Sequence, residues 1–188
     1  MTADDSIETV VLVSGGIDSA ACAAMYANNG GSTTGVFVDY GHPAAIEEFA
    51  SAEKVCAALG IPLLKTSFST DRITGPGEIV GRNALLIWSA VFASGIKKGV
   101  IAIGVHAGTT YYDCSSTFIT RMDNMLAEST NGLVRISAPF VNASKSEVFS
   151  YLQRSKVEAS LTYSCESGSK EPCGICASCQ DRTKLGLR

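Results

Sequence analysis

Near its N-terminus the chain runs from the apolar segment Thr9–Val13 through Gly15 and Gly16 into the alanine-rich segment Asp18–Ala27. A short apolar run ended by glycines is typical of a fully buried strand, and an alanine-rich segment is typical of a helix. A strand that turns directly into a helix is the repeating unit of a parallel sheet with crossover helices. This opening therefore favours an α/β fold.

The same alternation continues along the chain. The pattern predicts further strands at Thr34–Val38, Leu63–Ser67, Val100–Gly104 and Leu133–Ser137. It predicts helices at Ala45–Leu59, Asn83–Ser94 and Thr117–Ala127, and a last helix that starts at Ser144. Glu147 stands three residues after Ser144, a spacing typical of a capping box. We therefore expect a doubly wound parallel sheet within one compact unit, with an α/β domain over residues 1–160 and a metal-binding tail over residues 161–188.

The turn after the first strand has the residues of a phosphate-binding loop. Two glycines allow the backbone N–H groups to face inward, and the following helix N-terminus adds partial positive charge. The hydroxyls of Ser14 and Ser19 and the carboxylate of Asp18 would surround a pyrophosphate, and Asp18 could also hold Mg²⁺. Because no lysine follows to accompany a γ-phosphate, cleavage between the α and β phosphates is the expected chemistry. The alternative is an ordinary strand-to-helix turn capped by Asp18.

The tail contains a compact set of cysteines. Their spacing is C-x7-C-x2-C-x2-C, formed by Cys165, Cys173, Cys176 and Cys179. Each C-x2-C turn presents two thiolates on one side of a loop, and four thiolates complete the tetrahedral shell that Zn²⁺ prefers. We expect a structural zinc ion; an iron–sulfur cluster and reduced cysteines without metal are the alternatives.

Charge and segment composition narrow the function classes. The net charge of −3 and the isoelectric point near 5.4 give no sign of a nucleic-acid-binding protein. No signal peptide or membrane-spanning run is evident, so we expect a cytoplasmic protein whose cysteines are reduced or bound to metal.

Several motifs together resemble one enzyme family. Ser14–Ser19 resembles the signature of the N-type ATP pyrophosphatases, which adenylate their substrates on an adenine nucleotide alpha hydrolase-like fold. The cysteine tail with Tyr163 and Ser164 resembles the zinc knot of the 7-cyano-7-deazaguanine synthase (QueC-like) members of that group. Further stretches resemble the same family in the same order: Phe37-x-Asp39-Tyr40-Gly41, Gly81-Arg82-Asn83, Gly104-Val105, Tyr112-Asp113-Cys114, Ala138-Pro139 and Ser144-Lys145-x-Glu147.

The resemblance implies a reaction and its partners. Members of this family convert 7-carboxy-7-deazaguanine to the nitrile by way of the amide, with ATP and ammonia, and the resemblance also implies a homodimer. A carboxylate resists attack by an amine until adenylation gives it a good leaving group. Here the loop Gly108–Tyr111 is shorter than is usual in the family and free of acidic residues, Ser115-Ser116-Thr117 replaces the usual R-P-E, and the loop before Gly81 is abbreviated.

These departures leave the identity of the acid and of the amine open. The amine is ammonia or a larger amine on a protein or another macromolecule. A tRNA-modifying ATP pyrophosphatase is a further alternative, against which the acidic isoelectric point stands. A non-enzymatic zinc-ribbon module is disfavoured by the intact glycine loop.

Candidate site residues follow from the motifs. The expected ATP-binding residues are Ser14, Gly15, Gly16, Asp18, Ser19, Asp39 and Arg82, and the expected catalytic residues are Asp18, Ser19 and Lys145. The expected substrate-binding residues are Tyr40, Asn83, His106, Tyr112 and Asp113.

Chemistry supports some of these assignments. A carboxylate such as Asp113 can accept two adjacent N–H groups of a guanine-like base, and Arg82 can bind a phosphate or carboxylate with two hydrogen bonds. Lys145 at a helix N-terminus suggests an anionic partner. His106 would orient the substrate or act as a base. Each of these residues also has a purely structural interpretation, as a turn, cap or surface residue.

Overall fold

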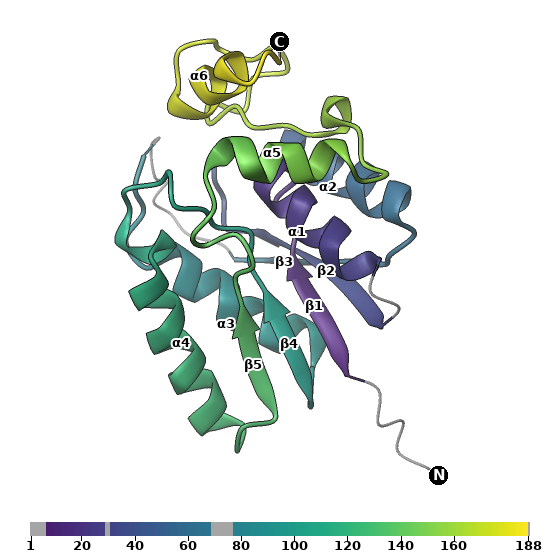
Figure 1. Ribbon diagram of the computed structural model, residues 1–188, viewed down its shortest axis with the longest axis vertical. Coiled ribbons are helices and arrows are strands. Elements are labelled where there is room, and N and C mark those ends of the chain that lie inside the picture. The colour runs from purple at the N-terminus through teal and green to yellow at the C-terminus, as the bar shows by residue number, and fades with distance from the viewer. Residues whose placement is uncertain (1–6, 29–30, 69–76, 188) are drawn as a thin grey trace.

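The computed structural model describes residues 7–28, 31–68 and 77–187. Within them a sheet of five parallel strands has the order β3-β2-β1-β4-β5 (Figure 1). The strands are β1 Glu8–Leu12, β2 Ser32–Asp39, β3 Leu63–Ser67, β4 Gly99–Ala102 and β5 Val134–Ser137. All four pairs of neighbouring strands are parallel, as the alternating pattern predicts.

Helices cover both faces of the sheet. One face carries α1 Ile17–Ala27, α2 Ala45–Leu59 and α5 Lys145–Gln153, and the other carries α3 Arg82–Ser94 and α4 Ser116–Ser129 (Figure 1). Residues of β1 alternate between the two layers: Val11 packs with α1, α2 and α5, and Val10 and Leu12 pack with α3 and α4. The predicted doubly wound fold is confirmed.

The strand order determines where a ligand can bind. The chain adds β2 and β3 on one side of β1 and then returns to place β4 and β5 on its other side. Connections therefore diverge beyond the carboxyl ends of β1 and β4, and this divergence leaves a crevice in folds of this kind.

Local predictions agree with the structure at one helix start and fail in the tail. Ser144 and Glu147 form the expected capping box, in which the Ser144 N–H donates to Glu147 Oε2 at 2.7 Å. The expectation that the helix after Ser144 is the last one is wrong, because α6 Ala177–Lys184 follows it within the cysteine tail. Its N-cap residue is Cys176, whose Sγ accepts the Cys179 N–H.

The shortened loop before Gly81 falls largely on residues 69–76, outside the described residues.

In the part of the chain that the structure describes, none of the helices has both the length and the apolar character needed to cross a membrane.

Candidate active site

A cavity of about 470 Å³ opens at the carboxyl edge of the sheet. Five parts of the chain line it: the glycine loop after β1, the segment after β2, the start of α3, the segment after β4 and the C-terminal tail. Lys145 at the start of α5 adds a cation to the same lining. The cavity thus lies at the crevice that the strand order creates.

The glycine loop is held by close backbone packing. A Cβ on Gly15, whose φ is +81°, would lie 2.5 Å from the Glu48 carbonyl oxygen, and one on Gly104 would lie 2.5 Å from the Asp18 carbonyl oxygen. Ser19 Oγ accepts the Ser14 N–H at 3.1 Å and donates to the Gly16 carbonyl at 3.0 Å. The N-cap residue of α1 is Gly16, which has no side chain to cap the helix, so the first N–H groups are free for an anion. Asp18 does not cap the helix, contrary to the alternative interpretation of this turn.

The carboxylate of Asp18 binds Lys145 instead. Lys145 Nζ lies 2.8 and 2.7 Å from the two carboxylate oxygens, and both side chains are about three-quarters buried. The two residues are 127 positions apart in the sequence, and they meet because α5 packs beside α1 (Figure 1). The expected anionic partner of Lys145 is therefore present within the chain itself.

His106 faces the same carboxylate. Its Nε2 lies 3.8 Å from Asp18 Oδ2, and its Nδ1 accepts the Gly108 N–H at 3.0 Å. Burial lowers the pKa of His106, and the neighbouring Asp18 carboxylate only partly opposes this. A neutral ring with an occupied Nδ1 carries its proton on Nε2, so this geometry favours a hydrogen-bond donor that orients a ligand over a base.

An aromatic wall lies on the β2 side of the cavity. Tyr40 stacks on His42 with 4.0 Å between ring centroids, and His42 Nε2 lies 2.9 Å from Glu48 Oε2. Burial raises the pKa of Tyr40, and the neighbouring Arg82 opposes that rise. His42 and Glu48 are not among the predicted site residues, because a residue after a Gly-containing turn carries no signal of its partner on the next helix. This wall suits a planar ring.

Four predicted site residues do not line the cavity: Gly15, Asp39, Tyr112 and Asp113. Gly15 packs on Glu48 instead. Asp39 accepts the Gly41 N–H and pairs with Lys65 at 3.3 Å. Asp113 is buried, where its carboxylate accepts the Asn83 N–H at 3.2 Å. Tyr112 is half exposed.

A short 3₁₀ turn, Tyr112–Cys114, explains the position of Asp113, because it folds the carboxylate back onto the start of α3. Asp113 therefore supports Asn83, which does line the cavity. Direct contact of Asp39, Tyr112 or Asp113 with a ligand stays a prediction.

The C-terminal tail forms a further wall of the cavity. The Tyr163 N–H donates to the Gly15 carbonyl at 2.9 Å, and a Cβ on Gly168 would lie 2.0 Å from the Pro43 carbonyl oxygen. The tail is therefore packed against both the glycine loop and the segment after β2. Its contributions to the lining are Tyr163, Ser164, Glu166, Ala177, Ser178, Asp181 and Arg182.

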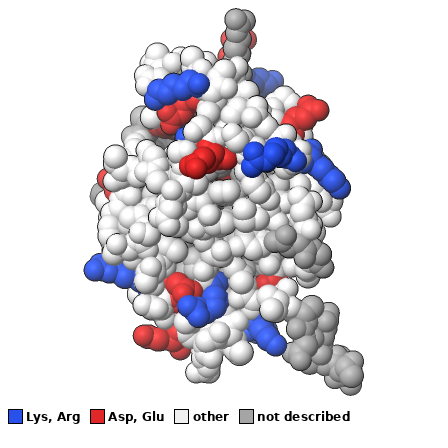
Figure 2. Space-filling view, in the orientation of Figure 1, with Lys and Arg blue, Asp and Glu red and all other residues white. Residues whose placement is uncertain are grey.

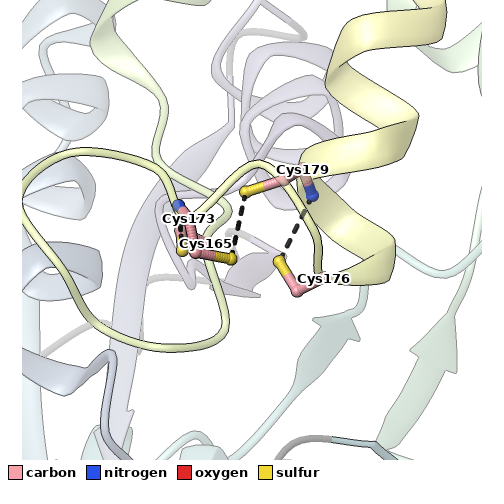
Figure 3. Close-up of side chains that lie close together, drawn as sticks. All are labelled: Cys165, Cys173, Cys176 and Cys179. Atoms are coloured by element: carbon pink, nitrogen blue, oxygen red, sulfur yellow. Dashed lines mark hydrogen bonds between the residues drawn. The ribbon is translucent and has the colours of Figure 1, made fainter.

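The four tail cysteines converge on one point (Figure 3). Their Sγ atoms all lie within 4.8 Å of one another, and Cys173 Sγ and Cys179 Sγ are 4.0 Å apart. A single tetrahedral ion with metal–sulfur bonds of about 2.3 Å requires sulfurs about 3.8 Å apart, so the geometry fits one such ion. An iron–sulfur cluster fits less well, because its thiolates bind different iron atoms and stand farther apart.

The thiols of this cluster differ in their pKa values. Burial opposes ionisation of Cys165, but hydrogen bonds, including one from the Cys173 N–H at 3.3 Å, outweigh it and lower the Cys165 pKa to about 5. Burial and neighbouring sulfurs raise the pKa of Cys179 to about 12. The cluster could therefore bind a metal ion such as zinc, whose charge would stabilise all four thiolates. Cys22 and Cys56 lie apart from this cluster, in the hydrophobic core, and burial raises the pKa of each.

Comparisons with known proteins identify one matching family and several relatives. The family described as queuosine biosynthesis protein QueC matches residues 8–79 and 71–187. The 7-cyano-7-deazaguanine synthase of Desulfotalea psychrophila is 26% identical over 210 positions, covering 97% of this chain and 94% of that protein. The 7-cyano-7-deazaguanine synthase of Caldicellulosiruptor saccharolyticus is 27% identical over 211 positions, covering 97% and 93%. Both alignments are longer than the 188-residue chain, so the relatives contain residues that this chain lacks.

A solved structure supports the fold alone. The NMN synthetase from Francisella tularensis superposes with a TM-score of 0.56 at 17% identity, covering 98% of this chain and 79% of that one.

Proposed function

The chain belongs to the family of the queuosine biosynthesis protein QueC, and we propose that it uses ATP to adenylate a 7-deazaguanine carboxylic acid and converts it through the amide to the nitrile. The relatives named above are 7-cyano-7-deazaguanine synthases, which supports an enzyme of this class. The observation on which the proposal rests is one cavity lined by two chemically different groups. The uncapped N-terminus of α1 is one, and the stacked rings of Tyr40 and His42 are the other.

The glycine loop would hold the triphosphate of ATP. The first N–H groups of α1 and the hydroxyls of Ser14 and Ser19 would donate to phosphate oxygens. Asp18 would hold Mg²⁺, which neutralises phosphate charge when it is bound. Lys145 would stabilise the departing pyrophosphate, since it lines the cavity beside Asp18.

The reaction then proceeds by substitution at two centres. A carboxylate oxygen of the acid attacks the α-phosphorus, and the bond to the bridging oxygen breaks to release pyrophosphate. Ammonia attacks the activated carbonyl carbon, the carbon–oxygen bond breaks, and AMP leaves with the oxygen to give the amide. A second ATP would activate the amide oxygen in the same way, and loss of AMP and protons would give the nitrile. The Nε2–H of His106 would donate to an oxygen of the reacting group.

The cysteine cluster would hold a structural zinc ion with no open coordination position. Residues 161–188 would fold together with the domain of residues 1–160 as one unit, because the tail packs on the glycine loop. A homodimer would cover the outward face of α3, where Phe92 is 86% exposed.

One observation favours a second candidate, in which the activated acid is joined to a larger amine on a protein or another macromolecule. The chain is shorter than its relatives, and its short loop residues Gly108, Thr109, Thr110 and Tyr111 line the cavity. A shorter loop leaves more room for a bulky nucleophile. A tRNA substrate is less well supported, because the net charge is −3 and the isoelectric point is near 5.4. On the face shown in Figure 2, positive and negative side chains are interspersed.

Mass spectrometry of the products tests the proposal. Incubation with ATP, Mg²⁺, ammonium and 7-carboxy-7-deazaguanine should yield the amide or nitrile together with AMP and pyrophosphate. Asp18→Asn should prevent both product formation and AMP formation. ADP and phosphate as the nucleotide products would exclude adenylation. Activation of the acid without amidation by ammonia would favour the larger amine.

A further inference from the structure

Arg182 is a cation of the cavity wall that no part of the proposed reaction uses. It lies on α6 in the cysteine tail and is partly buried. We propose that Arg182 binds an oxyanion of the substrate, so that the metal-binding tail supplies a binding residue to the active site. This inference rests on the proposed function, because the oxyanion is either a phosphate of ATP or the carboxylate of the acid.

Within the described residues, the hydrogen bonding of Arg182 leaves most of its donors available to a ligand. A guanidinium has five N–H donors, and Nη1 donates to Thr162 Oγ1 at 2.8 Å. Among the ion pairs of the described residues, Arg182 has no carboxylate partner. Cys179 on the same helix interacts electrostatically with Arg182 when its thiol is ionised, but it provides no oxygen acceptor. An oxyanion in the cavity would satisfy the remaining N–H donors of this partly buried guanidinium.

The other cations of the cavity wall already have partners. Lys145 is bound by both oxygens of Asp18, and Arg82 lies beside the Tyr40 hydroxyl. Arg182 can therefore accept an anion without breaking an existing ion pair. Its planar fork also matches the two oxygens of a carboxylate or a phosphate.

The cysteine cluster determines where Arg182 stands. Cys176 caps α6, Cys179 lies in its first turn, and Arg182 follows Cys179 by three residues, so the two side chains share a helix face. The start of α6 is also tied to the tail by Glu166, whose Oε1 accepts the N–H and the hydroxyl of Ser178 at 3.2 and 2.9 Å. A metal ion that joins Cys165 and Cys173 to α6 would hold the helix, and hence Arg182, against the cavity.

Calorimetric titration of the metal-loaded, full-length protein tests the inference in two arms, one with ATP and one with 7-carboxy-7-deazaguanine. Arg182→Gln should weaken binding of one ligand by about ten- to a hundredfold, the effect of losing charge-assisted hydrogen bonds. The arm that changes identifies the oxyanion. Arg182→Lys should retain part of the affinity, because lysine keeps the positive charge but lacks the planar guanidinium that donates two parallel hydrogen bonds. Lys170→Gln, an exposed neutralising change in the same tail, should bind both ligands as the wild type does.

Metal content, measured by atomic absorption, separates binding from structure. Equal metal in the wild type and in Arg182→Gln, together with weaker binding, supports the inference. Loss of metal from Arg182→Gln, or unchanged binding of both ligands, overturns it. If the wild-type protein binds neither ligand, the proposed function is wrong and the inference falls with it, whereas normal wild-type binding with an unaffected variant removes the inference alone.

Discussion

Replacing Gly104 by alanine should damage catalysis more than stability. Gly104 follows β4 and packs on the glycine loop, where an added Cβ would lie 2.5 Å from the Asp18 carbonyl oxygen and 2.9 Å from the Ser19 nitrogen. Ordinary van der Waals contact begins near 3.4 Å, so the loop and the β4 exit must separate by about 0.9 Å. Overpacking of this kind costs about 1–3 kcal/mol of the free energy of unfolding.

The same displacement moves the phosphate-binding groups. A misplacement of about 1 Å in a site that positions reactants can reduce the rate by about a hundredfold. Pyrophosphate release by Gly104→Ala should therefore fall by about that factor, while urea unfolding still shows a cooperative transition.

A matched glycine provides the control. Gly95 ends α3 with a φ of +65°, and a Cβ there meets nothing within 4 Å, so Gly95→Ala should cost about 1–2 kcal/mol from backbone strain alone. Its rate of pyrophosphate release should match the wild type. Wild-type turnover in Gly104→Ala would refute the argument that this close packing positions the active site.

Three further variants test separate parts of the structure. Cys176→Ser should abolish metal binding and lower Tm, as measured by atomic absorption and calorimetry; full metal content would exclude Cys176 as a ligand. Asp113→Ala should lower the free energy of unfolding by about 1–3 kcal/mol by leaving the buried Asn83 N–H unpaired; unchanged stability with weaker acid binding would instead indicate direct substrate contact. Because burial lowers the pKa of His106 below its ordinary 6.5, the unfolded chain binds the proton more readily, so stability should decline as the pH falls below that value. Urea unfolding on either side of that pH should show a smaller decline in His106→Gln, and an equal decline would contradict the argument.

The fold could be predicted because its signals are local. Apolar runs such as Thr9–Val13 separated by helical segments specify a parallel sheet, and the glycine loop has a motif whose geometry depends on neighbouring residues. The cysteine spacing likewise brings its ligands together over a short stretch of chain.

The pairing of site residues was harder to predict, because it depends on packing between distant elements. Lys145 meets Asp18 only after α5 has docked beside α1. The motif around Asp113 predicted a loop residue that binds the substrate. Instead, a 3₁₀ turn directs its carboxylate to the Asn83 N–H. Arg182 reaches the cavity because α6 begins inside the cysteine cluster, and the spacing of the cysteines predicts the metal ligands without predicting that helix.

Transfer of oxygen from the acid to AMP tests adenylation most directly. The reaction should be run with 7-carboxy-7-deazaguanine labelled with ¹⁸O in its carboxylate, and the AMP should be analysed by mass spectrometry. Attack of the carboxylate on the α-phosphorus followed by loss of AMP predicts one ¹⁸O atom in the AMP phosphate. AMP without the label, formed while the acid is consumed, would contradict the proposed mechanism.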